Sequence, residues 1–131
     1  MRRPGRFRVF PLYHQVEIRD AADVDRPRWE SGDEPVLASA QCIVLATRSD
    51  LEGPIEIEVR VGAGLDDPAA GQLLFDGELL TTGHGILVGN SLTELHRVAM
   101  PIGWHPVCIY ADQPANPARF TVLFDRGPAS G

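Results

Sequence analysis

Apolar and polar residues alternate along much of this 131-residue chain with a period of two, which is typical of β-strands. The clearest case is the segment PIEIEVRV, residues 54–61. Four branched apolar residues alternate there with two glutamates and an arginine. Because successive side chains of a strand point to opposite faces, this segment is expected to have one buried face and one solvent-facing face.

The same reasoning predicts the other strands of the fold. They are Phe7–Arg19, Leu37–Thr47, Gln72–Asp76, Glu78–Thr82, Gly85–Val88, Glu94–Met100, Pro106–Ala111 and Arg119–Phe124. The first is expected to bend at Pro11, since proline cannot sit inside a paired central strand. Residues 37–47 are apolar on both faces, which predicts a covered central strand. Asp76-Gly77 predicts a tight turn between the two short strands on either side.

Eleven prolines and thirteen glycines divide the chain at strand-length intervals, and helix signals are poor throughout. The prediction is an all-β, single-domain β-sandwich of about eight mainly antiparallel strands. The domain is expected to span residues 1–125, with residues 126–131 as a disordered tail.

The charge balance narrows the possible partners. The net charge is −6, which argues against direct nucleic-acid binding, because such binding needs clustered cations. No apolar run approaches the ~18 residues of a membrane helix, so no membrane partner is predicted. The basic N-terminus is not followed by an apolar signal-peptide region, and a cytoplasmic location is expected.

Acidic residues crowd into the segment from Asp20 to Glu34. Two interpretations remain open. The segment could form a face that meets a basic partner through electrostatic steering, or it could be a solvated loop that keeps the protein soluble.

The sequence has few motifs that indicate metal binding or catalysis. Cys42 and Cys108 have no CxxC or CxxH companion and are interpreted as buried, reduced small hydrophobic residues that could face each other in the core. The four histidines lack zinc-type spacing, and no nucleophile elbow is present. No cofactor, metal or catalytic residue is therefore predicted. A catalytic function would require His14 or His84 to lie within hydrogen-bonding distance of a carboxylate or cysteine that is distant in the sequence.

Two further features keep alternatives open. His84 lies between glycines in TTGHGI, on what is expected to be an exposed turn. The pair Asp66-Asp67, in GAGLDDPAAG, could join a loop-end calcium site, although calcium prefers six to eight oxygen ligands. A β-sandwich module that binds glycan, lipid or calcium is the alternative function.

The run Tyr13-His14-Gln15 lies inside a predicted strand. If Val16 and Ile18 point inward, His14 shares their face and Tyr13 and Gln15 share the other. From local chemistry alone, a packing role for His14 is favoured over a catalytic one.

The segment LYHQVEI resembles the opening of the ComJ (Nin) family, inhibitors of a DNA-entry nuclease in competent bacteria. The resemblance continues through Trp29 with Asp33 and Glu34, through AQCIVLATRSDLEGPIEIEV, and through HGILVGNSLTELHRVAMPIGWHPVCIY. The order of these features agrees over most of the chain.

The resemblance implies a non-enzymatic, acidic protein-binding domain, either a nuclease inhibitor or an immunity-type protein. The partner would be a basic protein such as a nuclease. The implied partner-binding residues are Tyr13, His14, Gln15, Trp29, Asp33 and Glu34, with Asp20, Asp23 and Asp25 as possible additions. A structural subunit of an assembly is the remaining hypothesis.

Overall fold

The structure is a computed structural model that describes residues 5–22, 27, 34–62, 64–90 and 94–125. The described chain is built of strands, with two short 3₁₀ turns, η1 (Asp50–Glu52) and η2 (Pro68–Ala70). The strands are β1 (Gly5–Val9), β2 (Gln15–Asp20), β3 (Val36–Ala38), β4 (Cys42–Ala46), β5 (Ile55–Val61), β6 (Gln72–Thr81), β7 (Ile86–Gly89), β8 (Leu95–Val98), β9 (Gly103–Ala111) and β10 (Arg119–Phe124). No helix in the described part is long and apolar enough to span a membrane.

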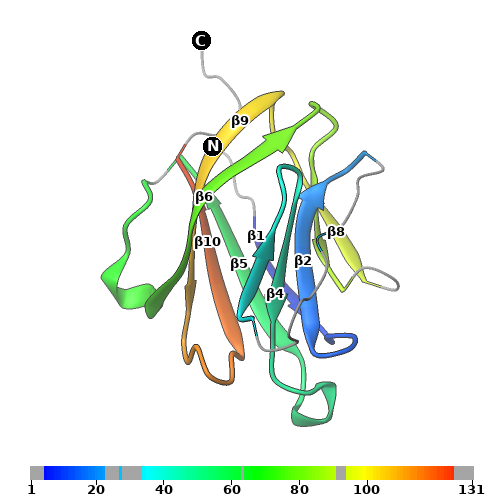
Figure 1. Cartoon of the computed structure of the whole chain (residues 1–131), viewed down its shortest axis with the longest axis vertical. Coiled ribbons are helices and arrows are strands. Elements are labelled where there is room, and N and C mark those ends of the chain that lie inside the picture. Colours follow the sequence, from blue (N-terminus) through cyan, green and yellow to red (C-terminus); the bar gives the residue numbers. More distant parts are fainter. Residues whose placement is uncertain (1–4, 23–26, 28–33, 63, 91–93, 126–131) are drawn as a thin grey trace.

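Two five-stranded sheets form the layers of a sandwich (Figure 1). The first sheet has the order β1-β5-β10-β9-β6, and the second has the order β3-β4-β2-β7-β8. All neighbouring strands are antiparallel except β5 and β10, which run parallel. The predicted all-β sandwich is confirmed, with ten strands in place of about eight.

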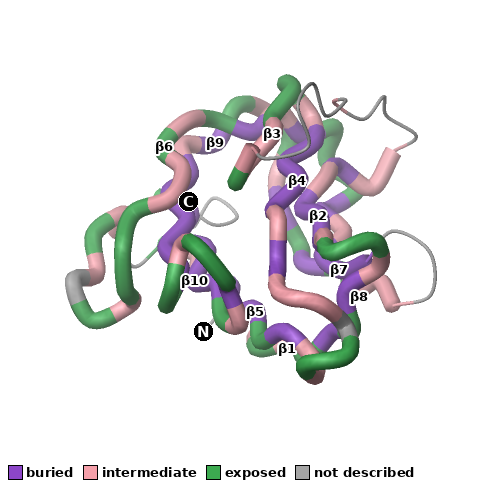
Figure 2. Tube along the Cα trace, turned by 60° about the horizontal axis from the view of Figure 1, so that its bottom comes forward, coloured by how far each residue is buried: buried purple, intermediate pink, exposed green. Residues whose placement is uncertain are grey.

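The core lies between the two sheets, and Figure 2 shows the buried residues along the facing strands. In β5 the expected alternation holds, since Ile55, Ile57 and Val59 are at most 1% exposed while Glu56 is exposed. Phe120 and Val122 on β10 lie opposite Ile57 and Val59, so the parallel pair contributes a continuous apolar surface. Burial of this surface is the main favourable contribution to folding.

Two predicted strands are each divided in the structure. The strand expected at 7–19 is β1 in the first sheet and β2 in the second, joined by a chain reversal that includes the buried Pro11. The strand expected at 37–47 is instead the hairpin of β3 and β4, closed where the Ser39 amide donates to the Cys42 carbonyl at 2.8 Å. The break in 7–19 lies where a bend was expected at Pro11. In 37–47 an apolar run does not show where a chain reverses, so the pattern concealed the hairpin.

The turn predicted at Asp76-Gly77 is wrong. Residues 72–81 form one continuous strand, β6, with an irregularity between Leu73 and Phe75. A Cβ atom on Gly77 would come within 2.7 Å of the Phe75 ring. Gly77 therefore makes room for an aromatic ring within a strand rather than allowing a turn.

The two cysteines are buried and reduced, but they do not face each other. Cys42 pairs with Arg19 on the side of the second sheet that faces away from the core. Cys108 belongs to a small separate cluster with Tyr110 and Leu123 on the outer side of the first sheet. Burial raises the pKa of the Cys108 thiol, which disfavours its reactive thiolate form.

The loop 62–71 covers that small outer cluster. The Tyr110 hydroxyl donates to the Leu65 carbonyl at 3.0 Å, and the Asp67 carboxylate accepts from the Ala69 amide at 3.0 Å. Arg60 bridges Glu58 at 2.8 Å and Asp67 at 2.5 Å. Asp67 is thus engaged in an ion pair and a turn, and no group of three or more metal-ligating side chains occurs among the described residues.

The Arg60 ion pairs predict a pH dependence of stability. Hydrogen bonds from Arg60 hold the pKa values of Glu58 and Asp67 below their ordinary values of 4.5 and 3.8. A carboxylate with a lowered pKa stabilises the fold above its unfolded pKa and loses this effect as the pH falls through its folded pKa. The Tm difference between the wild type and Arg60→Gln is therefore expected to be present at pH 7 and to shrink below pH ~4.5. A thermal denaturation series across this range tests it, and a difference that is constant down to pH ~2.5 would contradict it.

Candidate protein-binding site

Tyr13 and His14 form the tip of a tight reversal at one end of the sandwich. The Leu12 and Gln15 backbones exchange hydrogen bonds of 3.3 and 3.1 Å, and Tyr13 and His14 have φ values of 55° and 60°. Positive φ at both central residues is the pattern of a type I′ turn, which usually contains Asn-Gly. Two residues with large side chains occupy it here, and Tyr13 is 85% exposed.

This turn corrects the predicted geometry of the segment. Val16 and Ile18 do point into the core, and both are fully buried. His14 does not share their face, because the reversal begins before β2 and leaves His14 exposed. The predicted packing role for His14 is wrong, and Gln15 is the partly buried first residue of β2.

Backbone hydrogen bonds across β4 place Glu34 at the same end of the second sheet as the turn. The His14 carbonyl accepts from the Thr47 amide at 2.8 Å, and the Pro35 carbonyl accepts from the Ala46 amide at 3.0 Å. Since β4 lies between β3 and β2, the predicted residues Tyr13, His14, Gln15 and Glu34 lie at the same end of the second sheet, on strands separated by β4. The predicted Trp29 and Asp33, with Asp23 and Asp25, lie outside the described residues.

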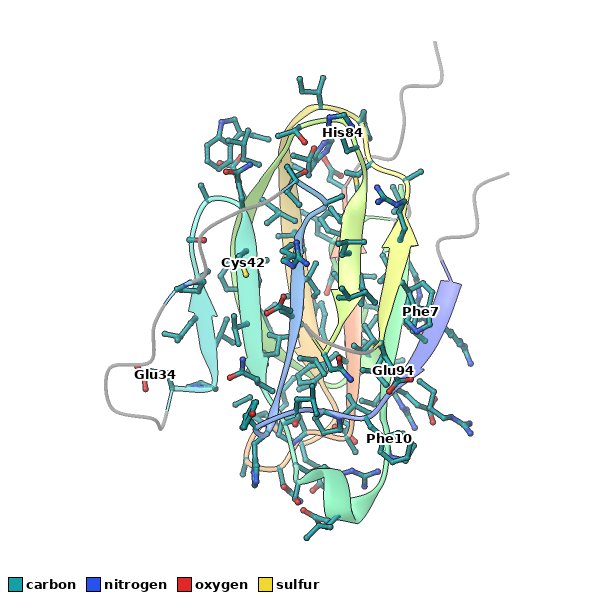
Figure 3. The ribbon with its side chains drawn as sticks, turned by 90° about the vertical axis from the view of Figure 1, so that its right-hand side faces the viewer. Phe7, Phe10, Glu34, Cys42, His84 and Glu94 are labelled. Carbon is teal, nitrogen blue, oxygen red and sulfur yellow. The ribbon has the colours of Figure 1, made fainter. Side chains whose placement is uncertain are left out.

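Three further loops complete this end of the molecule. The Arg48 amide donates to the Pro117 carbonyl at 3.0 Å, and the Asn116 side chain donates to Glu52 at 3.4 Å. The Phe10 amide donates to the Glu94 carboxylate at 2.9 Å. We call this region the Tyr13 end, and it comprises residues 10–15, 34–35, 47–54, 90, 94 and 112–118. Figure 3 shows His84 at one end and Phe10, Glu34 and Glu94 toward the other, with Glu34 on the opposite side of the molecule from Phe10 and Glu94.

The Tyr13 end combines exposed apolar side chains with carboxylates. Phe10 is 50% exposed and Leu51 is 92% exposed, in addition to Tyr13. Among the side chains described there, four are carboxylates and one is an arginine. They are Glu34, Glu52, Glu94, Asp112 and Arg48. Arg48 donates to the Pro54 carbonyl at 2.9 Å, so its charge is directed toward the chain's own backbone.

Sequence reasoning missed Phe10 and Leu51. Leu51 is a lone apolar residue in the polar turn SDLEG, and Phe10 directly precedes a proline at the end of a strand. An apolar residue in either context is a signal that its side chain lies outside the core. Phe10 is only three residues from Tyr13 in the sequence, whereas Leu51 reaches this end through the pairing of β4 with β2, which no local pattern reveals.

Asp20 does not belong to a binding surface. It is fully buried, and its carboxylate accepts from the Thr82 amide at 2.9 Å, the Thr82 hydroxyl at 2.8 Å and the Ala22 amide at 3.2 Å. This carboxylate joins the end of β2 to the segment that follows β6. The possible role of Asp20 in partner contact is therefore replaced by a structural role.

The histidines have other surroundings in the part of the chain that the structure describes. His14 and His84 are exposed, His105 bonds the Pro101 carbonyl at 2.7 Å, and His96 stacks on Phe7 at 4.6 Å. Within the part of the chain that the structure describes, no histidine side chain lies within hydrogen-bonding or ion-pair distance of a carboxylate or a cysteine.

Comparison with known proteins gives a fold-level match. No family model and no curated protein matches the sequence. Among solved structures, the chain is similar to ComJ from Bacillus subtilis, described as an inhibitor of the DNA-degrading activity of NucA. The TM-score is 0.71 at 12% sequence identity, and the match covers 92% of this chain and 93% of that one. The two proteins share a fold over nearly their whole length.

Proposed function

We propose that this protein is a non-enzymatic, ComJ-like binding protein that inhibits a nuclease or a related basic protein. The observation that carries the proposal is the shared fold with a nuclease inhibitor across 92% of the chain. The net charge of −6 supports it, since an acidic protein is attracted to the cationic surface that a DNA-degrading enzyme presents to phosphates.

We propose the Tyr13 end as the contact surface. Exposed aromatic and aliphatic side chains that can enter a partner's pockets supply most of the energy of protein interfaces, and Tyr is enriched among such residues. Phe10, Tyr13 and Leu51 are of this kind, and the surrounding carboxylates would meet basic groups on the partner. Glu34 adds to this acidic rim, and Trp29 and Asp33, neighbours of Glu34 in the sequence, are proposed to contribute as well.

The test begins with affinity capture from lysate of the source organism, with the tagged full chain as bait at low and high salt. Capture alone is not sufficient. The captured nuclease is then purified, and its degradation of DNA is measured against increasing amounts of this protein. We expect inhibition that saturates near one equivalent at low salt and weakens at high salt, because exposed charge pairs are screened. A nuclease that keeps its full activity, or capture of no nuclease at low salt, would contradict the proposal.

Leu51→Ala tests the proposed surface, with Leu73→Ala as a matched control. Both leucines are exposed, by 92% and 53%, but Leu73 lies on β6, outside the Tyr13 end. We expect Leu51→Ala to weaken inhibition about tenfold, the effect of truncating an apolar anchor, and Leu73→Ala to leave it unchanged. Equal inhibition constants for the two variants would exclude Leu51 from the interface.

A further inference from the structure

The end of the sandwich opposite Tyr13 has a hollow with a mainly apolar lining. Its volume is about 610 Å³, and its lining is formed by the turn 83–85, Arg97 and residues 99–101. Met100 is buried beneath it with 3% exposure, while His84 and Ala99 are exposed. Ile102, which is 75% exposed, and Trp104, which is 54% exposed, follow along the same chain segment.

Backbone geometry places the turn 83–85 against the end of β8. Gly83 and Gly85 have φ values of +96° and +88°, a region that side chains rarely permit. A Cβ atom on Gly85 would lie 2.8 Å from the Val98 carbonyl oxygen, so the turn packs its bare backbone against the end of β8. The glycines thus let the turn pack closely against β8 and form one wall of the hollow.

Arg97 supplies a cation at the edge of this hollow. Its guanidinium donates to the His84 carbonyl, which holds the side chain beside the turn. Within the described part of the chain, no carboxylate lies within ion-pair distance of Arg97. The guanidinium has five N–H groups, so groups remain for a carboxylate ligand after this one bond.

We propose that this hollow binds a segment of a partner protein that presents an aromatic or aliphatic side chain next to a carboxylate. The apolar side chain would lie against Ala99 and Met100, and the carboxylate would pair with Arg97. Charge complementarity assigns this occupant, because Arg97 places a cation at the edge of an apolar surface. An open hollow suits a protein segment, whereas small-ligand sites usually enclose most of the ligand.

This surface is separate from the Tyr13 end, and its occupant has the opposite charge to the basic partner proposed there. The inference therefore does not depend on nuclease inhibition. Trp, Arg and Tyr are the side chains enriched at interface hot spots. The end of the molecule that holds the hollow includes Trp104 and Arg97.

A random dodecapeptide display library, selected on the immobilised full chain, tests the proposal with probes of defined length and unbiased sequence. Enriched peptides are expected to share a large apolar residue adjacent to Asp or Glu. Their affinity is then measured for the wild type and for Arg97→Gln, with Arg119→Gln as the matched control. Arg119 is an exposed arginine on β10 that has no ion pair among the described residues.

We expect Arg97→Gln to weaken these peptides about tenfold and Arg119→Gln to leave them unchanged, since only the first variant removes a charge-assisted contact. Ala99→Phe, at an exposed position that tolerates a larger side chain, is expected to block the hollow and abolish binding. Enrichment of peptides without acidic residues, equal affinity for Arg97→Gln, or the absence of any enriched peptide would each overturn the proposal.

Discussion

Replacing Tyr13 with Asn and His14 with Gly is expected to raise the free energy of unfolding by about 1–2 kcal/mol and to abolish tight partner binding. Each residue now has a positive φ, which costs of order 1–3 kcal/mol for a side chain of this size. Asn-Gly adopts the same turn without that cost. Glycine also increases the conformational entropy of the unfolded chain, which offsets part of the gain in stability.

The same double variant removes the 85% exposed Tyr13 side chain from the proposed interface. We expect the inhibition constant to rise at least about thirtyfold, the loss typical of an aromatic hot spot. Urea denaturation measures the stability and a nuclease assay measures the binding. His14→Gly alone is the control, because it relieves strain and keeps Tyr13. Unchanged inhibition by the double variant would show that the strained turn has no part in binding.

Asp20→Ala is expected to lower the free energy of unfolding by about 2–4 kcal/mol. The variant deletes three hydrogen bonds to a fully buried carboxylate and leaves the Thr82 and Ala22 amides without their acceptor. For a protein with a total stability of about 5–15 kcal/mol this is a large fraction. The loss arises because β2 is no longer joined to the segment after β6.

Chemical denaturation of the wild type, Asp20→Asn and Asp20→Ala measures this effect. Asp20→Asn is expected to fall between the other two, because its carbonyl oxygen can still accept from the Thr82 amide. Asp125→Ala is the matched control at an exposed carboxylate with no hydrogen-bond partner among the described residues, and it is expected to change stability by less than about 0.5 kcal/mol. Equal stability of Asp20→Ala and Asp125→Ala would refute the structural role of Asp20.

The strands whose bounds the sequence predicted best are β10, which is buried at all but its first position, and β5, in which burial alternates. β10 matches its predicted bounds, 119–124, and β5 begins one residue after the predicted start at Pro54. The errors occurred where a local signal had a second physical explanation. Gly77 suggested a turn but makes room for the Phe75 ring, and residues 37–47 were apolar on both faces although a hairpin lies within them.

The candidate site was predictable only in part, for a similar reason. Tyr13 and Glu34 were named from a family resemblance, and the structure places them at one end of the second sheet. Phe10 lies in the same loop as Tyr13, but Leu51 comes from the loop after β4, which reaches the turn only when β2 and β4 pair. Asp20 seemed to be one of many acids in a polar segment, and only the position of Thr82 in space shows that it is buried.

The position of β10 has a consequence for biosynthesis. This strand is the middle member of the first sheet, yet a ribosome makes it after all the other strands of that sheet. Until residues 119–124 emerge, β5 with β1 and β9 with β6 remain two separate pairs. In each pair the strand that will contact β10 has unpaired backbone groups and apolar side chains. Nascent chains and fragments that end before residue 119 are therefore expected to need protection from aggregation, and the sandwich closes only once its central strand is released.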